Sequence, residues 1–323
     1  MEMGLLRFIK NWTLPVAIVS GAVVYFIFAY IPALDGAATF FAPVLDALLP
    51  VLMFFVLAVT FCKVDFKRLI PVKWHLWVTL CQVLFVALIT AAMVGFGVEG
   101  KSLIIMEAIL TCVSGPCATA AAVVTQKLGG DLEEMTTFTF ISNFVTALLI
   151  PICFPIIDKS ADMPFWSAFG EILYKVCIVL VAPMALAFFV KHYMKRLHRW
   201  VIGVKDLSYY LWGVNLMIVS GITVRNIVHA ETSAAFIATI AVLSLVVCIA
   251  LFATGRLIGR RFGNTVDAGQ AFGQKNTAFS IWIASTYLTP LSTVGPGCYI
   301  LWQNIINSIE IWMCRRNGTE RTT

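Results

Sequence analysis

The chain has 323 residues, of which 60% are hydrophobic and only 12% are charged. Soluble domains carry about 25% charged residues, and one water-soluble core of this length could not hide so much apolar surface. The composition therefore excludes a soluble globular protein, and the net charge of +6, spread over short segments between apolar runs, does not indicate a nucleic-acid partner.

Ten apolar runs predict membrane-spanning helices, because a helix needs about 20 predominantly apolar residues to cross a bilayer. They lie near residues 12–31, 42–62, 74–96, 102–128, 133–157, 167–190, 207–228, 234–258, 265–287 and 293–314. The fourth and ninth runs are interrupted by glycine and polar residues, whereas the others are plain. The predicted fold is therefore all-α, a polytopic membrane protein with ten transmembrane helices.

The distribution of lysine and arginine predicts the orientation of these helices, since both residue types are enriched in cytoplasmic loops. With both chain ends inside, eighteen of the 23 basic residues fall in cytoplasmic segments, and only Lys101 and Lys159 fall in outside loops. Removing or adding one helix would destroy this alternation. We therefore expect a multi-pass protein of the cell (inner) membrane, surrounded by the lipid bilayer, with both termini in the cytoplasm.

The two interrupted runs indicate an internal repeat. Thr119 in the fourth run and Thr277 in the ninth lie roughly half the chain length apart, and the same shift superimposes the order of the surrounding helices. Each repeat would hold five helices. Because five is an odd number, the second repeat, residues 161–323, would enter the membrane upside down relative to the first, residues 1–160. Inverted repeats with matched broken helices mark many secondary transporters, whose sites lie near the bilayer midplane.

Gly115 and Pro116 interrupt the fourth helix within an otherwise apolar run. Proline lacks a backbone donor and clashes with the preceding turn, so it predicts either a kink in a packed helix or an unwound segment. Unwound backbone at this depth is tolerated only where protein or a water-filled cavity satisfies it. The candidate substrate residues in this segment are Gly115, Pro116, Cys117, Ala118 and Thr119.

Gln274, Lys275, Asn276 and Thr277 form the most informative polar stretch, inside the ninth run. A lysine near the middle of a membrane is costly and marks a functional site by default. The structural alternatives are an ion pair with Glu107 on the fourth helix or a lysine in a wet vestibule. We assign all four residues to the candidate substrate site.

Further polar side chains are placed to support this crossing. Thr139, Ser142 and Asn143 share one face of the fifth helix, where hydrogen bonding between helices and contact with the broken fourth helix are equal alternatives. Gln82 on the third helix and Glu107 complete the supporting set. The sequence contains no enzyme signature, cofactor motif or cluster with metal-ligand spacing, so neither an enzyme nor a cofactor is expected.

These residues give the chain a resemblance to the bile acid:sodium symporter family, within a wider group that includes arsenite exporters and auxin-carrier-like proteins. The similarity covers nearly the whole chain, and its local anchors are residues 116–120, the Gly-Gly-Asp stretch at 129–131 and the Gly-x-x-Asn-Thr stretch at 273–277. The resemblance implies small or amphipathic organic anions, bile-acid-like or carboxylate, as substrates.

The same resemblance implies a panel domain and a core domain, with the substrate bound in the cleft between them and moved by alternating access. The panel would hold helices 12–31, 42–62, 167–190 and 207–228. The core would hold the helices within 74–157 and 234–314, among which the fourth and the ninth cross.

The sequence departs from the sodium-coupled members of this family. Where those members typically carry Ser-Asn on helix four, this chain has Ala121 and Ala122, and Ala271 replaces the acid on helix nine. Lys275 replaces the usual glutamine, and its ammonium would repel sodium, which needs oxygen ligands and usually a carboxylate. We expect Lys275 to occupy the place of the cation and transport to be independent of sodium. Proton coupling through Lys275 and a permanent lysine charge remain alternatives.

Two other functions fit parts of the pattern. Cys117 after Pro116 is similar to the broken helix of arsenite exporters, although Ala278 stands where their acid would fall. Arsenite sensitivity of cells that carry Cys117→Ser distinguishes this function. A membrane receptor that kept the fold would bind a ligand without moving it, whereas a secondary transporter of organic anions is the function that the residues favour.

Overall fold

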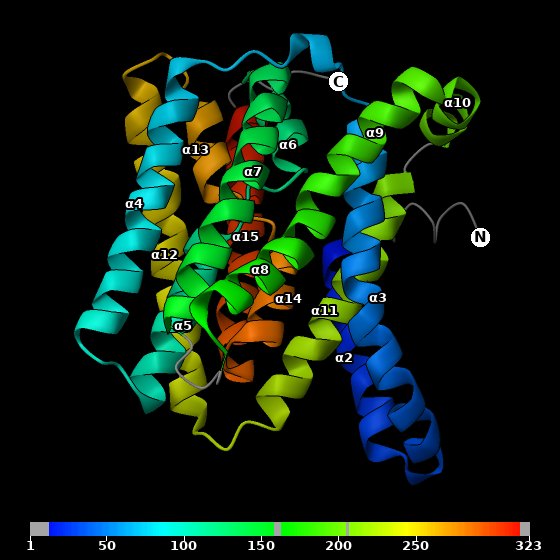
Figure 1. Ribbon diagram of the computed structural model, residues 1–323, viewed down its shortest axis with the longest axis vertical. Helices are drawn as coiled ribbons and strands as arrows, with labels where there is room; N and C mark the ends of the chain where they lie inside the picture. Colours follow the sequence, from blue (N-terminus) through cyan, green and yellow to red (C-terminus); the bar gives the residue numbers. More distant parts are fainter. Residues whose placement is uncertain (1–12, 158–162, 205–206, 317–323) are drawn as a thin grey trace. The chain divides into compact units, whose positions relative to one another are not determined.

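The computed structural model describes residues 13–157, 163–204 and 207–316, and Figure 1 shows how the helices are arranged. No strand occurs among these residues. The chain divides into two compact units. One runs to Lys63 and also holds Pro183–Glu231, and the other holds Val64–Ala182 and continues from Thr232. The division falls inside the predicted helix 167–190, directly before a proline.

The first unit is built from helices joined by short links. Its elements are α2 (Thr13–Tyr30), η1 (Pro32–Leu34), α3 (Asp35–Cys62), α9 (Ala182–Tyr193), α10 (Lys195–Gly203) and α11 (Leu207–Val228). Helices α2 and α11 approach each other at Gly21, where an added Cβ atom would collide with the carbonyl oxygen of Met217. Small residues allow such close contact between membrane helices, so this crossing needs glycine.

Two features of the first unit differ from the expectation based on apolar runs. Helix α3 begins at Asp35, before the predicted run 42–62, because an acidic residue in the first turn favours a helix N-terminus. The basic segment after α9, expected as a loop, forms the short helix α10. The His198 ring of this helix contacts the carbonyl oxygen of Cys62 at 2.8 Å, which fixes α10 at the end of α3.

The second unit contains the remaining elements. They are η2 (Phe66–Arg68), α4 (Lys73–Gly95), α5 (Gly100–Ser114), α6 (Ala121–Lys127), α7 (Leu132–Ile157), α8 (Phe165–Val176), the π-helical turn η3 (Cys177–Val181), α12 (Ala234–Arg260), α13 (Thr265–Gly273), α14 (Thr277–Tyr287), η4 (Pro290–Thr293) and α15 (Val294–Arg316). Helices α12 and α13 pack most extensively. At their contact, a Cβ atom on Gly255 would collide with the carbonyl oxygen of Ala268, and one on Gly259 would collide with the carbonyl oxygen of Asn264.

The π-helical turn η3 interrupts a helical run that extends over 29 residues, Phe165–Tyr193. Pro183 follows this turn two residues later, and proline cannot donate the backbone hydrogen bond that a regular helix requires. A single widened turn accommodates such a missing bond without ending the helix.

The described residues contain six helices that are long and apolar enough to cross a membrane, or seven if the bent pair Pro15–Tyr30 and Pro32–Phe41 counts as one span. The two interrupted helices are not among the six, because each is divided into short pieces. The structure therefore confirms an all-helical protein with several apolar spans, while the ten-helix inverted repeat stays a prediction. The chain ends and Lys159, on which the expected orientation partly depends, lie outside the described residues.

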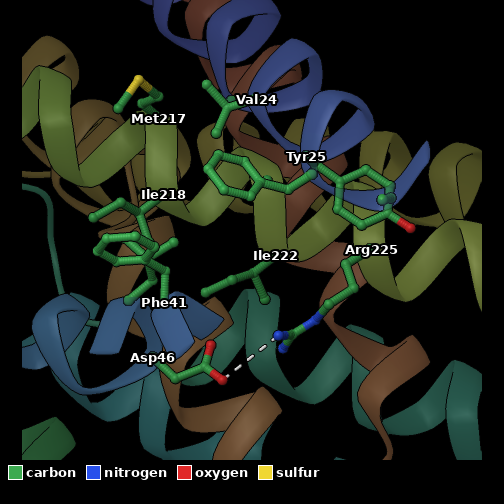
Figure 2. Close-up of a pocket in the computed structure, with 13 residues that line it drawn as sticks. Val24, Tyr25, Phe41, Asp46, Met217, Ile218, Ile222 and Arg225 are labelled. Atoms are coloured by element: carbon green, nitrogen blue, oxygen red, sulfur yellow. Dashed lines mark ion pairs between the residues drawn. The ribbon is translucent and has the colours of Figure 1, made fainter. Parts of the chain in front are cut away.

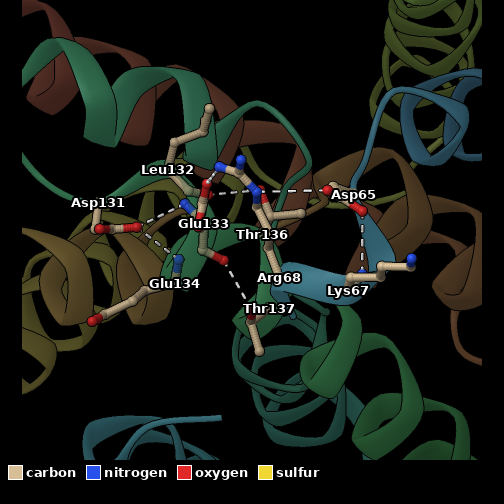
Figure 3. A network of polar contacts seen from close by, with 9 residues as sticks. All are labelled: Asp65, Lys67, Arg68, Asp131, Leu132, Glu133, Glu134, Thr136 and Thr137. Carbon is tan, nitrogen blue, oxygen red and sulfur yellow. Dashed lines mark hydrogen bonds and ion pairs between the residues drawn. The ribbon is translucent and has the colours of Figure 1, made fainter. Parts of the chain in front are cut away.

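A polar network connects the start of α7 to its neighbours (Figure 3). The Asp131 carboxylate accepts hydrogen bonds from the backbone N–H groups of Glu133 and Glu134, at 2.8 and 2.9 Å, and so caps the helix. The N–H of Asp131 donates to the Asp267 carboxylate at 2.6 Å, and a Cβ atom on Gly130 would collide with that carboxylate. The Gly-Gly-Asp stretch at 129–131 therefore has a structural role, because it joins α7 to α13.

Replacing Glu134 by alanine is expected to lower the free energy of unfolding by about 1–3 kcal/mol, because two donors lose their acceptor. The Glu134 carboxylate accepts from Nε1 of Trp74 at 2.6 Å and from Nδ2 of Asn264 at 2.9 Å, which ties α7 to α4 and to the start of α13. Thermal unfolding of the purified protein in detergent measures the change.

The matched control is Glu133→Ala, in the adjacent position. Glu133 forms an exposed ion pair with Arg68 at 2.5 Å and, as hydrogen-bond acceptor and nearby charge, raises the pKa of that guanidinium. Exposed ion pairs contribute at most about 1 kcal/mol, so this variant should unfold close to the parent. Equal melting temperatures for the two variants would contradict the role assigned to Glu134.

Candidate functional site

The chain leaves the helix at both positions where the sequence predicts a break. Helix α5 ends at Ser114 and α6 begins at Ala121, while α13 ends at Gly273 and α14 begins at Thr277. The residue after each first half, Gly115 and Gln274, has extended backbone. The second halves of the two broken helices, α6 and α14, begin where the unwound segments end.

The two unwound segments lie side by side and satisfy each other's backbone. The N–H of Ala118 donates to the carbonyl of Gln274 at 3.0 Å, and the N–H of Asn276 donates to the carbonyl of Pro116 at 2.8 Å. Non-helical backbone inside a membrane persists only where such partners exist. The proline break in one helix thus supplies acceptors and donors for the polar break in the other.

Cys117 and Lys275 lie opposite each other between these bonds and form an isolated antiparallel bridge. A side chain from a neighbouring helix holds each of the two backbones. The N–H of Cys117 donates to Oγ of Ser142 on α7 at 2.8 Å. The Gln303 amide on α15 accepts from the N–H of Lys275 at 2.9 Å and donates to its carbonyl at 3.2 Å. Both polar groups of the Lys275 backbone are therefore paired with one side chain.

Side chains from α4 and α7 hold the open end of α5. Nε2 of Gln82 donates to the carbonyls of Ser114 and Gly115 at 3.3 Å each. The Thr146 hydroxyl donates to the same Ser114 carbonyl at 3.2 Å. Thr146 is absent from the predicted set, although its spacing of four residues from Ser142 on α7 is a signal for it.

The break between α13 and α14 is held in the same way. The Tyr299 hydroxyl on α15 donates to the carbonyl of Gly273 at 2.6 Å, and Oδ1 of Asn276 caps α14 by accepting from the N–H of Phe279 at 3.3 Å. Oε1 of Gln274 is buried without a hydrogen-bond partner among the described residues. Tyr299 and Gln303 are not predicted site residues, but they lie four apart and so share one face of α15.

The side chain of Lys275 is 1% exposed. Its Nζ atom makes no hydrogen bond and no ion pair within the described part of the chain. It lies 5.0 Å from the centre of the Phe272 ring and near the thiols of Cys81, Cys112 and Cys117. An ammonium buried in this way is costly, and a contact with an aromatic face offsets only part of that cost. The site is therefore deficient in negative charge.

Glu107 does not pair with Lys275, so the interpretation of Lys275 as half of a structural ion pair is wrong. The Glu107 carboxylate instead accepts a hydrogen bond from the N–H of Thr289 at 3.1 Å, directly before η4. An acceptor at the start of a helical turn satisfies a donor that the turn itself leaves free. The carboxylate therefore caps η4, which explains its burial on an apolar helix.

The predicted polar face of α7 has three different environments. The Ser142 hydroxyl contacts the backbone of the unwound segment. The Thr139 hydroxyl donates to the Met135 carbonyl of its own helix at 3.0 Å and also contacts the Cys117 thiol. Asn143 is 0% exposed, and neither atom of its amide has a partner among the described residues. An unsatisfied buried amide is rare, so Asn143 marks a place for a further polar group.

Three alanines stand where the resemblance to the family leads us to expect sodium ligands in sodium-coupled members. Ala121, Ala122 and Ala271 are buried in the second unit and offer no side-chain oxygen. Ala118 and Thr119, in the segment between the halves of the fourth helix, are half-buried. In the part of the chain that the structure describes, no three His, Cys, Asp or Glu side chains gather to hold a metal ion.

A separate cavity of about 410 Å³ lies within the first unit, between α2, α3 and α11 (Figure 2). Its lining is largely apolar, with Tyr25 and Phe41 among the side chains that Figure 2 labels. Asp46 and Arg225 line it as well and form an ion pair at 3.5 Å, with both side chains partly exposed. Asp46 and Arg225 are therefore partners of each other within this unit.

Two comparisons with known proteins complete the description of the site. A family model described as the sodium bile acid symporter family matches residues 48–258, which is more than half of the chain. The match extends from α3 into α12 and includes the broken fourth helix. No curated protein matches the chain at a significant level.

Proposed function

Because the chain belongs to the sodium bile acid symporter family, whose members are membrane transporters, we propose that it is a secondary transporter of a small or amphipathic organic anion. The observation that carries the proposal is the buried Lys275 amine, which has no counter-charge among the described residues. The proposal includes alternating access, ten spans as two inverted repeats, and both chain ends on the cytoplasmic side.

The crossing of the two broken helices supports recognition of an anion. Lys275 supplies a full charge, and the N-terminus of α14 begins two residues later, where backbone dipoles favour negative groups. Buried polar atoms without partners, on Gln274 and Asn143, are available to a substrate or to water that accompanies it. A carboxylate bound there would satisfy the amine and gain charge-assisted hydrogen bonds.

The same residues argue against sodium as the coupling ion. Sodium is a hard cation that needs several oxygen ligands, and Ala121, Ala122 and Ala271 provide none. An ammonium about 4 Å from a sodium ion would repel it by about 4 kcal/mol at an effective dielectric constant near 20. We therefore propose that Lys275 takes the place of the cation.

The test is flux through the purified protein in proteoliposomes, measured with radiolabelled taurocholate and a panel of small carboxylates. A transporter gives protein-dependent uptake that excess unlabelled anion inhibits. Binding of an anion in a thermal-shift assay without any uptake would identify a receptor instead. Uptake of arsenite, abolished by Cys117→Ser, with no uptake of organic anions would replace the proposal by arsenite export.

A further inference from the structure

The Lys275 amine lies in surroundings that supply no negative charge. Within the described residues, the titratable groups that interact with it are the thiols of Cys81 on α4, Cys112 on α5 and Cys117 in the unwound segment. The Phe272 ring on α13 covers another side. A charge held here is not compensated by water, because the side chain is almost completely buried.

The carboxylates on the helices around the crossing are engaged elsewhere. Glu107 on α5 accepts from the backbone before η4, and Asp267 on α13 accepts from the backbone before α7. Glu310 on α15 pairs with Arg256 on α12. The hydroxyl of Tyr299 donates to the carbonyl at the end of α13. Among the described residues, none of these carboxylates is placed to neutralise an ammonium at Lys275, which leaves that role to a bound ligand.

We propose that Lys275 carries the coupling proton, so that one proton crosses the membrane with each monovalent anion. This inference rests on the proposed function, because it requires an anion at the crossing. On one side of the membrane the neutral amine takes a proton from water as the anion binds. On the other side the anion leaves and the ammonium returns the proton to water. The amine is then regenerated, and no net charge has moved.

The physical basis is the mutual dependence of the two charges. The anion stabilises the ammonium by the same free energy with which the ammonium stabilises the anion, since coupling between two sites is reciprocal. A lysine amine can exchange its proton in a buried site, whereas an arginine guanidinium remains protonated. The unpaired Nζ atom at the junction of two unwound segments meets the structural requirement for this coupling.

The experiment measures accumulation of a transported anion from the panel in sodium-free proteoliposomes under an imposed pH gradient, with the membrane voltage clamped at zero. One proton per monovalent anion predicts about tenfold accumulation per pH unit, towards the alkaline side. A voltage imposed without a pH gradient should cause no accumulation. A proton-selective ionophore should abolish the pH-driven component.

One variant and one control distinguish proton exchange at residue 275 from a fixed positive charge there. Lys275→Arg keeps a cation, so it should still exchange labelled for unlabelled anion but should no longer accumulate anion in response to pH. The control is Lys101→Gln, since Lys101 also lies over a phenylalanine ring, that of Phe236 at 5.5 Å, but is exposed. This control should accumulate anion as the parent does.

The outcomes distinguish the inference from the function on which it rests. If no anion in the panel is transported, the proposed function fails and proton coupling fails with it. If an anion is transported but its accumulation follows voltage or sodium rather than pH, the function stands and proton coupling is refuted. Accumulation by Lys275→Arg equal to that of the parent would also refute it.

Discussion

Replacing Lys275 by glutamine is expected to lower anion uptake at subsaturating concentration by about tenfold to a hundredfold, because a hydrogen bond to a charged group contributes about 1.5–3 kcal/mol. Glutamine removes the charge while it keeps a polar side chain. The loss should arise mainly from a higher KM, since the charge acts on the bound anion. Initial rates in proteoliposomes measure it.

A second substitution separates this effect from a loss of folding. Lys275→Met removes an amine that has no partner among the described residues, so its melting temperature should equal or exceed that of the parent. Lys101→Gln, at an exposed lysine, is the matched control for the charge. Uptake by Lys275→Gln at the rate of the parent would mean that the charge at the crossing is irrelevant to the substrate.

Replacing Gln303 by leucine is expected to lower the free energy of unfolding by about 1–3 kcal/mol, because the buried N–H of Lys275 is left without an acceptor. The Gln303 amide accepts from the N–H of Lys275 at 2.9 Å and donates to its carbonyl at 3.2 Å, and that carbonyl also accepts from the N–H of Thr277 at 2.9 Å. Loss of this clamp should also misplace the amine, so uptake should fall along with stability. Thermal unfolding and uptake are measured on the same preparation.

The neighbouring residue provides the control. Nδ2 of Asn304 donates to the carbonyl of Ile300 within α15 itself, at 2.6 Å, and that carbonyl belongs to a regular helix. Asn304→Leu should therefore leave stability and uptake nearly unchanged. If the two leucine variants had the same melting temperature and the same uptake, the pairing of Gln303 with the unwound segment would contribute nothing to stability or transport.

The positions of both helix breaks could be predicted from the sequence, because proline and a polar tetrapeptide are incompatible with a regular apolar helix. The hydrogen-bond partners of the two unwound segments could not be predicted from the sequence. The bonds of Pro116 and Gln274 to each other's segments join residues far apart in the chain, and no local pattern specifies such a pairing. The contributions of Tyr299 and Gln303 were missed for the same reason, since polar residues on a helix do not reveal which neighbour they face.

Glu107 shows the limit of reasoning from charge alone. An acid and a lysine in neighbouring apolar helices suggest an ion pair, yet the carboxylate caps η4, an element that the apolar runs do not reveal. The short helix α10 and the π-helical turn η3 escaped prediction because hydropathy averages over about 20 residues, longer than either element. The roles of the crossing residues in transport stay predictions.

At the crossing, the positive charge is proposed to come from the Lys275 amine and not from a metal cation. The most direct measurement is uptake of a transported anion by the purified protein with sodium replaced by choline or potassium over a wide concentration range. We expect the same initial rate and the same KM in all of these salts. A rate that rises with sodium and saturates would contradict it, because it would require a sodium site where the chain offers Lys275 and three alanines.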